Sequence, residues 1–201
     1  MTKKIFKYII ISAIVLISLS IIGIASIVIL LWGHCFFSNH DSVQSVRTKL
    51  LNGIESYQTQ EEFESYLAKN SFQWQKEPED FDTEDPIKSI HIRAFDTIIV
   101  KNYKHHDFYM DLRVSFFYNR LMEVLWTPDE TKADKIRNYT EAIMTKDHVS
   151  FKKEDGEILE ADLEPYTRII VNNRKNEWGG FVNWMDTRLF HEYSKWEMCH
   201  D

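Results

Sequence analysis

The segment His191-Glu192-Tyr193-Ser194-Lys195 contains the first half of a zinc-protease motif. That chemistry needs His-Glu-x-x-His on a helix, which places two imidazoles one turn apart with the glutamate as general base. Lys195 occupies the position of the second histidine, and an ammonium group must lose its proton before it can bind zinc. We therefore expect no zinc-protease centre here.

A second group of ligand-type residues is His105-His106-Asp107, with His91 on the strand that we expect to precede it. Neighbouring residues on a strand point to opposite faces, so two adjacent histidines would not converge on one ion. The pattern predicts a solvated hairpin turn, with a pH-sensitive contact as the alternative. We predict no metal site, no cofactor and no catalytic residue.

The densest charge cluster is acidic and lies in a loop at 76–88 between two prolines. An EF-hand is excluded, because Asp85 stands where the loop needs glycine and His91 where it needs a bidentate glutamate. A solvated loop is one interpretation; a loose ion site and a docking segment for a basic protein are the others. The candidate docking residues are Glu79, Asp80, Asp82, Glu84 and Asp85.

Aromatic residues crowd the last part of the chain. Most should pack in the core, since rings bury much surface, but an exposed subset would anchor a protein partner. The candidate anchors are Trp178, Phe181 and Trp184.

Cys35 and Cys199 could form a disulfide on the outer side of a membrane, or remain free thiols, or pair with another chain. The chain contains no Gly-x-Ser-x-Gly and no Cys-x-x-Cys motif.

Periodicity predicts the elements that must position these residues. We expect a helical hairpin over 42–70, whose second helix opens with a capping box at Thr59 and Glu62 and stops at Asn70. Strands are predicted at 89–100, 108–118 and 121–126, then a helix from Thr127 to about residue 146. Further strands are expected at 149–151, 158–159, 166–171 and 178–185, while 189–196 fits a helix or a strand. No internal repeat is evident. The fold class is α+β, with an antiparallel sheet covered on one side by helices.

Tyr8–Trp32 contains no charged residue and follows three lysines. As a helix it would be about 37 Å long, enough to cross a hydrocarbon core of about 30 Å. A cleaved signal peptide and a lipidated Cys35 are the alternatives to an uncleaved anchor. The positive flank places the N-terminus in the cytoplasm. Residues 1–34 would then form the cytoplasmic tip and anchor, and 35–201 one domain in the periplasm or outside the cell.

Beyond the anchor region the chain has 21 basic and 31 acidic residues. This balance excludes nucleic acid as a partner, because nucleic-acid binding relies on neutralising phosphates. It is compatible with a basic protein. The sequence thus predicts a membrane-anchored, non-enzymatic protein-binding domain, of an inhibitor, immunity or envelope-complex kind. Two alternatives remain open: an enzyme that acts on envelope material through carboxylates or histidines, and a structural subunit that assembles through its transmembrane helix.

Overall fold

The computed structural model describes residues 46–77, 94–128, 133–153, 158–173 and 180–200. Contacts divide the chain into two units, one spanning Val43–Ser194 and the other including Lys195–His200. The sheet and the site described below lie in the first unit. None of the helices in the described residues is both long and apolar enough to cross a membrane. The expected anchor at Tyr8–Trp32 and the acidic loop from 78 onward lie outside the described residues.

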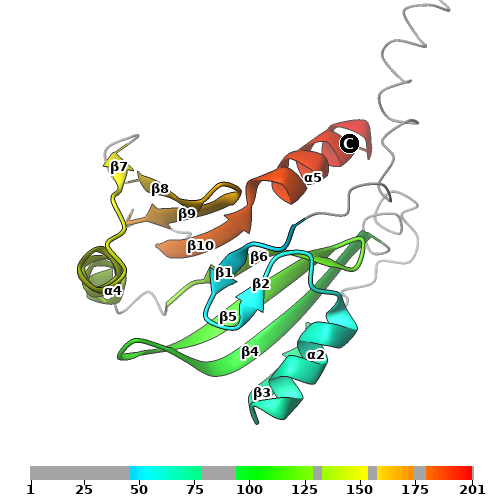
Figure 1. The fold of residues 1–201 in the computed structure, drawn as a ribbon, viewed down its shortest axis with the longest axis horizontal. Helices are drawn as coiled ribbons and strands as arrows, with labels where there is room; N and C mark the ends of the chain where they lie inside the picture. The colour runs from blue at the N-terminus through cyan, green and yellow to red at the C-terminus, as the bar shows by residue number, and fades with distance from the viewer. Residues whose placement is uncertain (1–45, 78–93, 129–132, 154–157, 174–179, 201) are drawn as a thin grey trace, which may run out of the picture. The chain divides into compact units, whose positions relative to one another are not determined.

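The elements are numbered as in Figure 1. They are β1 (Lys49–Leu51), β2 (Ile54–Glu55), α2 (Gln60–Lys69), β3 (Gln73–Lys76), β4 (Phe95–His105), β5 (Phe108–Phe117), β6 (Arg120–Trp126), α4 (Ala133–Lys146), β7 (Lys152–Lys153), β8 (Ile158–Glu164), β9 (Thr167–Asn172), β10 (Phe181–Asp186) and α5 (Thr187–His200).

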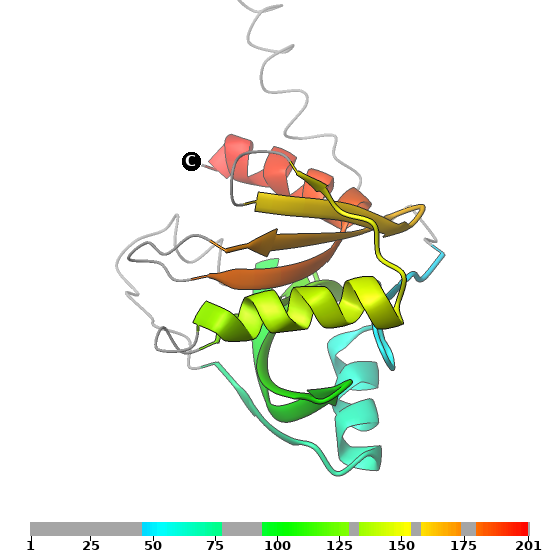
Figure 2. The same cartoon turned by 90° about the vertical axis from the view of Figure 1, so that its left-hand side faces the viewer.

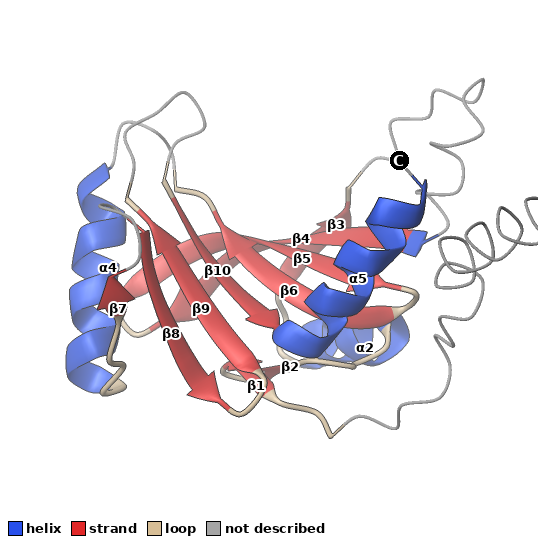
Figure 3. Ribbon diagram, turned by 90° about the horizontal axis from the view of Figure 1, so that it is seen from above, coloured by secondary structure: helices blue, strands red, loops and turns tan. Residues whose placement is uncertain are grey.

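Eight of the strands form one antiparallel sheet in the order β3-β4-β5-β6-β10-β9-β8-β7. It consists of two four-stranded meanders that meet where β6 pairs with β10 (Figure 3). Helix α4 connects the centre of this sheet to its far edge, because it follows β6 and precedes β7. The α+β class predicted from the sequence is confirmed.

Among the described elements, a helix followed by four strands occurs twice, first from α2 to β6 and then from α4 to β10. The two central strands also share a Val-x-Trp sequence, at Val124–Trp126 and Val182–Trp184. In the register each Trp pairs with the Val of the other strand. The repetition was not evident from the sequence because the two halves share so few residues.

Helices pack on both faces of the sheet. Phe116 and Phe117 are neighbours on β5 and therefore point to opposite faces. The ring of Phe116 lies 5.8 Å from Phe63 of α2, whereas that of Phe117 lies 5.8 Å from Tyr193 of α5. The expected one-sided cover is thus wrong, and the cause is the segment that fitted either helix or strand, because it forms α5 and its part up to Ser194 packs on the second face.

The predicted helix ends and strand bounds are accurate where they depend on residues that are close in the chain. Thr59 accepts a hydrogen bond from the Glu62 amide at 3.2 Å, and Glu62 accepts one from the Thr59 amide at 2.8 Å, which confirms the predicted capping box. Asn70 ends the helix, as expected. Strands β5, β6 and β9 lie within one residue of their predicted bounds. The turn between β5 and β6 has left-handed backbone at Tyr118 and Asn119, which suits a tight hairpin.

The first helix of the hairpin predicted over 42–70 is wrong in its described part, where residues 49–55 form the β1–β2 hairpin. Apolar residues every four positions fit a helix, but Gly53 adopts φ 78° and turns the chain back. Thr48 and Ser56 then bond across the hairpin, with the Ser56 amide 2.9 Å from the Thr48 carbonyl. Long-range contacts hold the turn, since the Tyr103 hydroxyl donates to the Asn52 carbonyl at 2.6 Å.

Candidate functional site

A pocket of about 280 Å³ lies against α4, within the Val43–Ser194 unit. We call it the α4 pocket. Its wall combines the β1–β2 hairpin, the end of β4, one side of α4 and the strands β8 to β10. The lining residues are Lys49, Leu50, Leu51, Asn52, His105, Tyr139, Ile143, Asp147, Val149, Leu163, Glu164, Ile169 and Trp184. Figure 2 shows α4 lying between the β8–β10 strands and the β4–β5 hairpin.

Tyr139 is the fixed centre of this region. It lies on α4, is fully buried, and its ring meets Trp126 and Trp184 edge-on at centroid distances of 5.3 and 5.8 Å. The ring of Phe108 makes a third edge-on contact at 5.2 Å. Such contacts add to the burial energy and fix the ring orientation. The inner wall of the pocket is therefore preformed.

The Tyr139 hydroxyl and Nδ1 of His105 lie 2.7 Å apart and share a hydrogen bond. His105 is 7% exposed. Burial, and secondarily the nearby charge of His106, lowers the pKa of His105 to about 4. Burial also raises the pKa of Tyr139 far above its ordinary value. Both groups are thus neutral at pH 7 and form an uncharged polar pair at the pocket wall.

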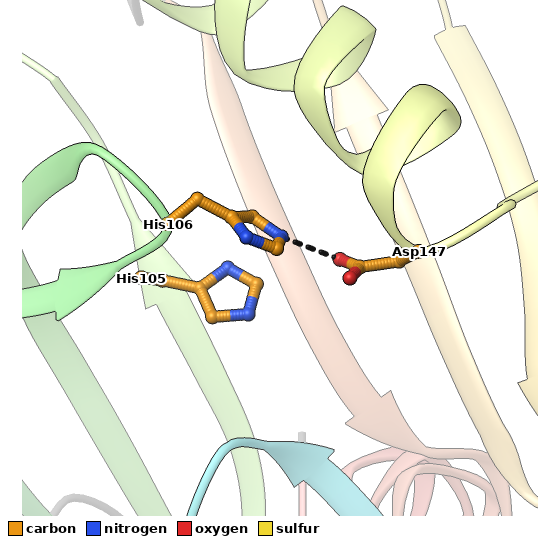
Figure 4. A group of neighbouring side chains, drawn as sticks. All are labelled: His105, His106 and Asp147. Carbon is orange, nitrogen blue, oxygen red and sulfur yellow. Dashed lines mark hydrogen bonds and ion pairs between the residues drawn. The ribbon is translucent and has the colours of Figure 1, made fainter.

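His106 joins His105 at the same place, contrary to the expectation that adjacent histidines diverge. Strand geometry ends at His105, and His106 has φ 52° in the hairpin turn, so strand alternation no longer applies. The two imidazole centroids lie 4.3 Å apart. His106 Nε2 donates to Asp147 Oδ2 at 2.8 Å (Figure 4). The solvated turn predicted from the sequence is wrong for His105.

Asp147 reaches this cluster because of the way that α4 ends. Its amide donates to the Ile143 carbonyl at 3.0 Å, and His148 then adopts a left-handed φ of 56°. A left-handed residue after the last turn is a common helix terminus. One residue earlier, Lys146 forms an ion pair with Asp107 at 2.6 Å. Two side-chain pairs therefore tie the end of α4 to the β4–β5 turn.

A second buried polar group has a structural role. Asp186 is fully buried, and Arg188 donates to both of its carboxylate oxygens, at 3.0 and 2.6 Å. Burial alone would raise the pKa of Asp186, but the hydrogen bonds from Arg188 and Ser56 outweigh it and hold this pKa below its ordinary value. The guanidinium lies over the rings of Tyr57 and Tyr166. This arrangement fixes the junction of β10 with α5.

The structure places the predicted site residues in different environments. Phe181 is half-buried on β10, whereas Trp184 is 2% exposed and packs in the core at the pocket wall, so it is not an exposed anchor. Glu192 of the incomplete protease motif pairs with Arg120 at 2.9 Å. The remaining predicted residues lie outside the described part of the chain: Cys35, Glu79, Asp80, Asp82, Glu84, Asp85, Trp178 and the side chain of Cys199.

Sequence reasoning missed Tyr139 and Asp147, which no motif links to the histidine doublet. The helical spacing of Ile136, Tyr139 and Ile143 does show that Tyr139 faces the core. Nothing in the sequence shows which hairpin would meet that face. The chain was compared with models of known protein families and with curated proteins, and it matches none of them.

Proposed function

We propose that this protein is a membrane-anchored, extracytoplasmic binding domain that holds a protein partner at the α4 pocket. The observation that carries the proposal is the preformed pocket itself, with an aromatic inner wall and polar groups around it. Binding sites are typically concave and largely apolar, with a few well-placed polar groups that orient the ligand.

The chemistry of the pocket supports binding over catalysis. The lining residues named above include no serine, threonine or cysteine that could act as a nucleophile. The His105 imidazole is bound through Nδ1 to the buried Tyr139 hydroxyl, which restrains it. A general base works best with a pKa near the working pH, and the pKa of His105 lies well below that. The rival proposal, an enzyme of envelope material, would have to rest on the two carboxylates among the lining residues, Asp147 and Glu164.

The surroundings of the pocket support a protein as the occupant. Lys49 and Glu164 lie at its edge and are both exposed, and the Lys49 amide donates to Glu164 Oε2 at 3.4 Å. A partner can therefore meet one charge of each sign beside the apolar wall. The excess of acidic residues beyond the anchor would steer a basic partner toward the domain. The acidic loop and Phe181 remain proposed contacts of that partner.

The uncharged run Tyr8–Trp32 supports the anchor, and the lysines before it support a cytoplasmic N-terminus. In this proposal the bilayer is contacted through that segment alone. A Cys35–Cys199 disulfide is compatible with the outer location. A structural subunit that assembles through its transmembrane helix is the second rival, and an unrelated membrane span in place of Tyr8–Trp32 would abolish its assembly.

Site-specific photo-crosslinking in native membranes tests the proposal. A photo-reactive phenylalanine analogue replaces Lys49 at the pocket, and in a matched control it replaces Lys69, an exposed residue at the end of α2 that does not line the pocket. Both changes leave the backbone hydrogen bonds available. We expect one discrete protein adduct from position 49 and none from position 69. Equal adducts from both positions, or none from either, would contradict the proposal.

A further inference from the structure

We propose that His105, His106 and Asp147 bind one divalent first-row transition metal ion, with Zn²⁺ as the preferred ion, at the edge of the α4 pocket. Each of the three side chains offers one ligand atom, and these atoms all lie within 4.8 Å of one another (Figure 4). The inference is independent of the proposed protein partner.

The distances are close to those of a bound ion. In a tetrahedral zinc site with bonds of about 2.1 Å, ligand atoms are separated by about 3.4 Å. His106 Nε2 and Asp147 Oδ2 lie 2.8 Å apart, which is slightly too close, and the other separations are at most 4.8 Å. Side-chain rotations that move the ligand atoms by about 1 Å would make the three equidistant from one ion. On binding, the proton of His106 would move from Nε2 to Nδ1, so that the ring stays neutral and Nε2 presents its lone pair to the ion.

The ligand set selects the class of metal. Two imidazoles and one carboxylate suit zinc and its first-row neighbours, whereas calcium and magnesium prefer sites made of oxygen alone. Three protein ligands also leave a coordination position for water or for a partner's side chain. His105 and Asp147 both line the α4 pocket, so that position would face the pocket.

The surroundings restrain the ligands as they do in known metal sites. A ligating histidine usually bonds through its other ring nitrogen to a fixed group, and losing that group lowers metal affinity about 10- to 100-fold. His105 has such a bond, from Nδ1 to the Tyr139 hydroxyl. His106 adopts φ 52°, a backbone conformation that costs a histidine free energy and that here directs its ring toward Asp147. The Lys146–Asp107 ion pair holds the helix end and the hairpin turn together.

His148 provides a matched control. It has a left-handed φ of 56°, close to that of His106, and lies one residue beyond Asp147, but it is exposed and is not part of the cluster. Asparagine tolerates left-handed backbone, so both His106→Asn and His148→Asn should preserve the fold. Thermal unfolding without metal checks this, and Asp147→Asn removes the third ligand without changing its size.

The test is titration of the full chain in detergent micelles with Zn²⁺, after treatment with a chelator. We expect the wild type and His148→Asn to bind one more zinc per chain than His106→Asn or Asp147→Asn, or to bind it at least about tenfold more tightly. Co²⁺ in place of Zn²⁺ should give the visible absorption of a low-coordinate nitrogen and oxygen site in the wild type and in His148→Asn, but not in His106→Asn or Asp147→Asn. Equal zinc binding by wild type and His106→Asn would overturn the inference, as would a Co²⁺ spectrum identical to that of the aqueous ion.

Discussion

The hydroxyl of Tyr139 lies 2.7 Å from Nδ1 of His105, although 34 residues separate them in the chain. This contact joins the middle of α4 to the last residue of β4. Because Tyr139 is fully buried among aromatic rings, the contact fixes the position of His105 at the wall of the α4 pocket. One buried, uncharged hydrogen bond therefore positions the only histidine among the described residues that line this pocket.

Removing the Tyr139 hydroxyl should destabilise the fold. In Tyr139→Phe the ring remains, but Nδ1 of the buried His105 loses its partner, which costs about 1–3 kcal/mol. The control is Tyr109→Phe on β5, where the residue is 62% exposed and the change should stay within about 0.5 kcal/mol. Urea unfolding of both variants measures the difference, and equal midpoints would show that the bond contributes nothing.

Stability should fall between pH 6.5 and 4 because of His105. An unfolded histidine titrates near 6.5, whereas the pKa of folded His105 is about 4, so the unfolded state binds more protons in this window. The contribution is complete above pH 6.5 and decreases as the pH falls. We expect the free energy of unfolding to drop by about 2 kcal/mol more in the wild type than in His105→Gln between pH 7.5 and 5.

Chelator-treated protein should be used for that comparison, so that a bound metal does not contribute. Urea unfolding at both pH values gives the two free energies for each protein. If the free energy of unfolding falls equally in the wild type and in His105→Gln, His105 has an ordinary pKa in the folded state.

Because Arg188 pairs with the buried carboxylate of Asp186, it should contribute far more to the free energy of unfolding than an exposed arginine does. Arg188→Ala leaves a fully buried charge without its partner, for which a loss of about 3–5 kcal/mol is expected. Arg47 also contacts both oxygens of a carboxylate, that of Glu62, but the two side chains are 40% and 45% exposed. Arg47→Ala should cost at most about 1 kcal/mol. Similar losses for the two variants would contradict this role of burial.

The proposed anchor makes a prediction about fractionation and orientation. The full chain should remain in the membrane pellet after alkaline carbonate extraction, because 25 uncharged residues would have to leave the bilayer. A reporter enzyme that is active only outside the cytoplasm should be active when fused after Asp201. Release of the chain by carbonate would contradict the anchor, and an inactive reporter of normal abundance would contradict the orientation.

Much of the local structure was predictable from the sequence because neighbouring residues determine it. The capping box at Thr59 and the alternating strand at Phe108–Phe117 are examples, since a cap or a pleat needs only residues that are close in the chain. The β1–β2 hairpin was not predictable. Its turn depends on the hydroxyl of Tyr103, about fifty residues away in the chain.

The candidate site was less predictable than the fold. His105 and His106 were recognised as ligand-type residues, but strand alternation suggested that they diverge. The left-handed backbone at His106 makes the two rings converge instead. The sequence gives no sign of that backbone conformation. Asp147 comes from the end of α4, so its proximity depends on tertiary packing alone. Residue types identified two members of the cluster, and only the fold could supply the third.

The central claim is that a protein partner occupies the α4 pocket, and a pocket-filling variant tests it most directly. Leu163→Trp adds a large ring at the pocket wall, whereas Met144→Trp adds the same ring at an exposed position of α4 that does not line the pocket. Each is combined with the photo-reactive residue at position 49, and adduct yield is compared in native membranes. We predict that Leu163→Trp abolishes the adduct while Met144→Trp preserves it, with similar unfolding midpoints. An undiminished adduct in Leu163→Trp would contradict the claim.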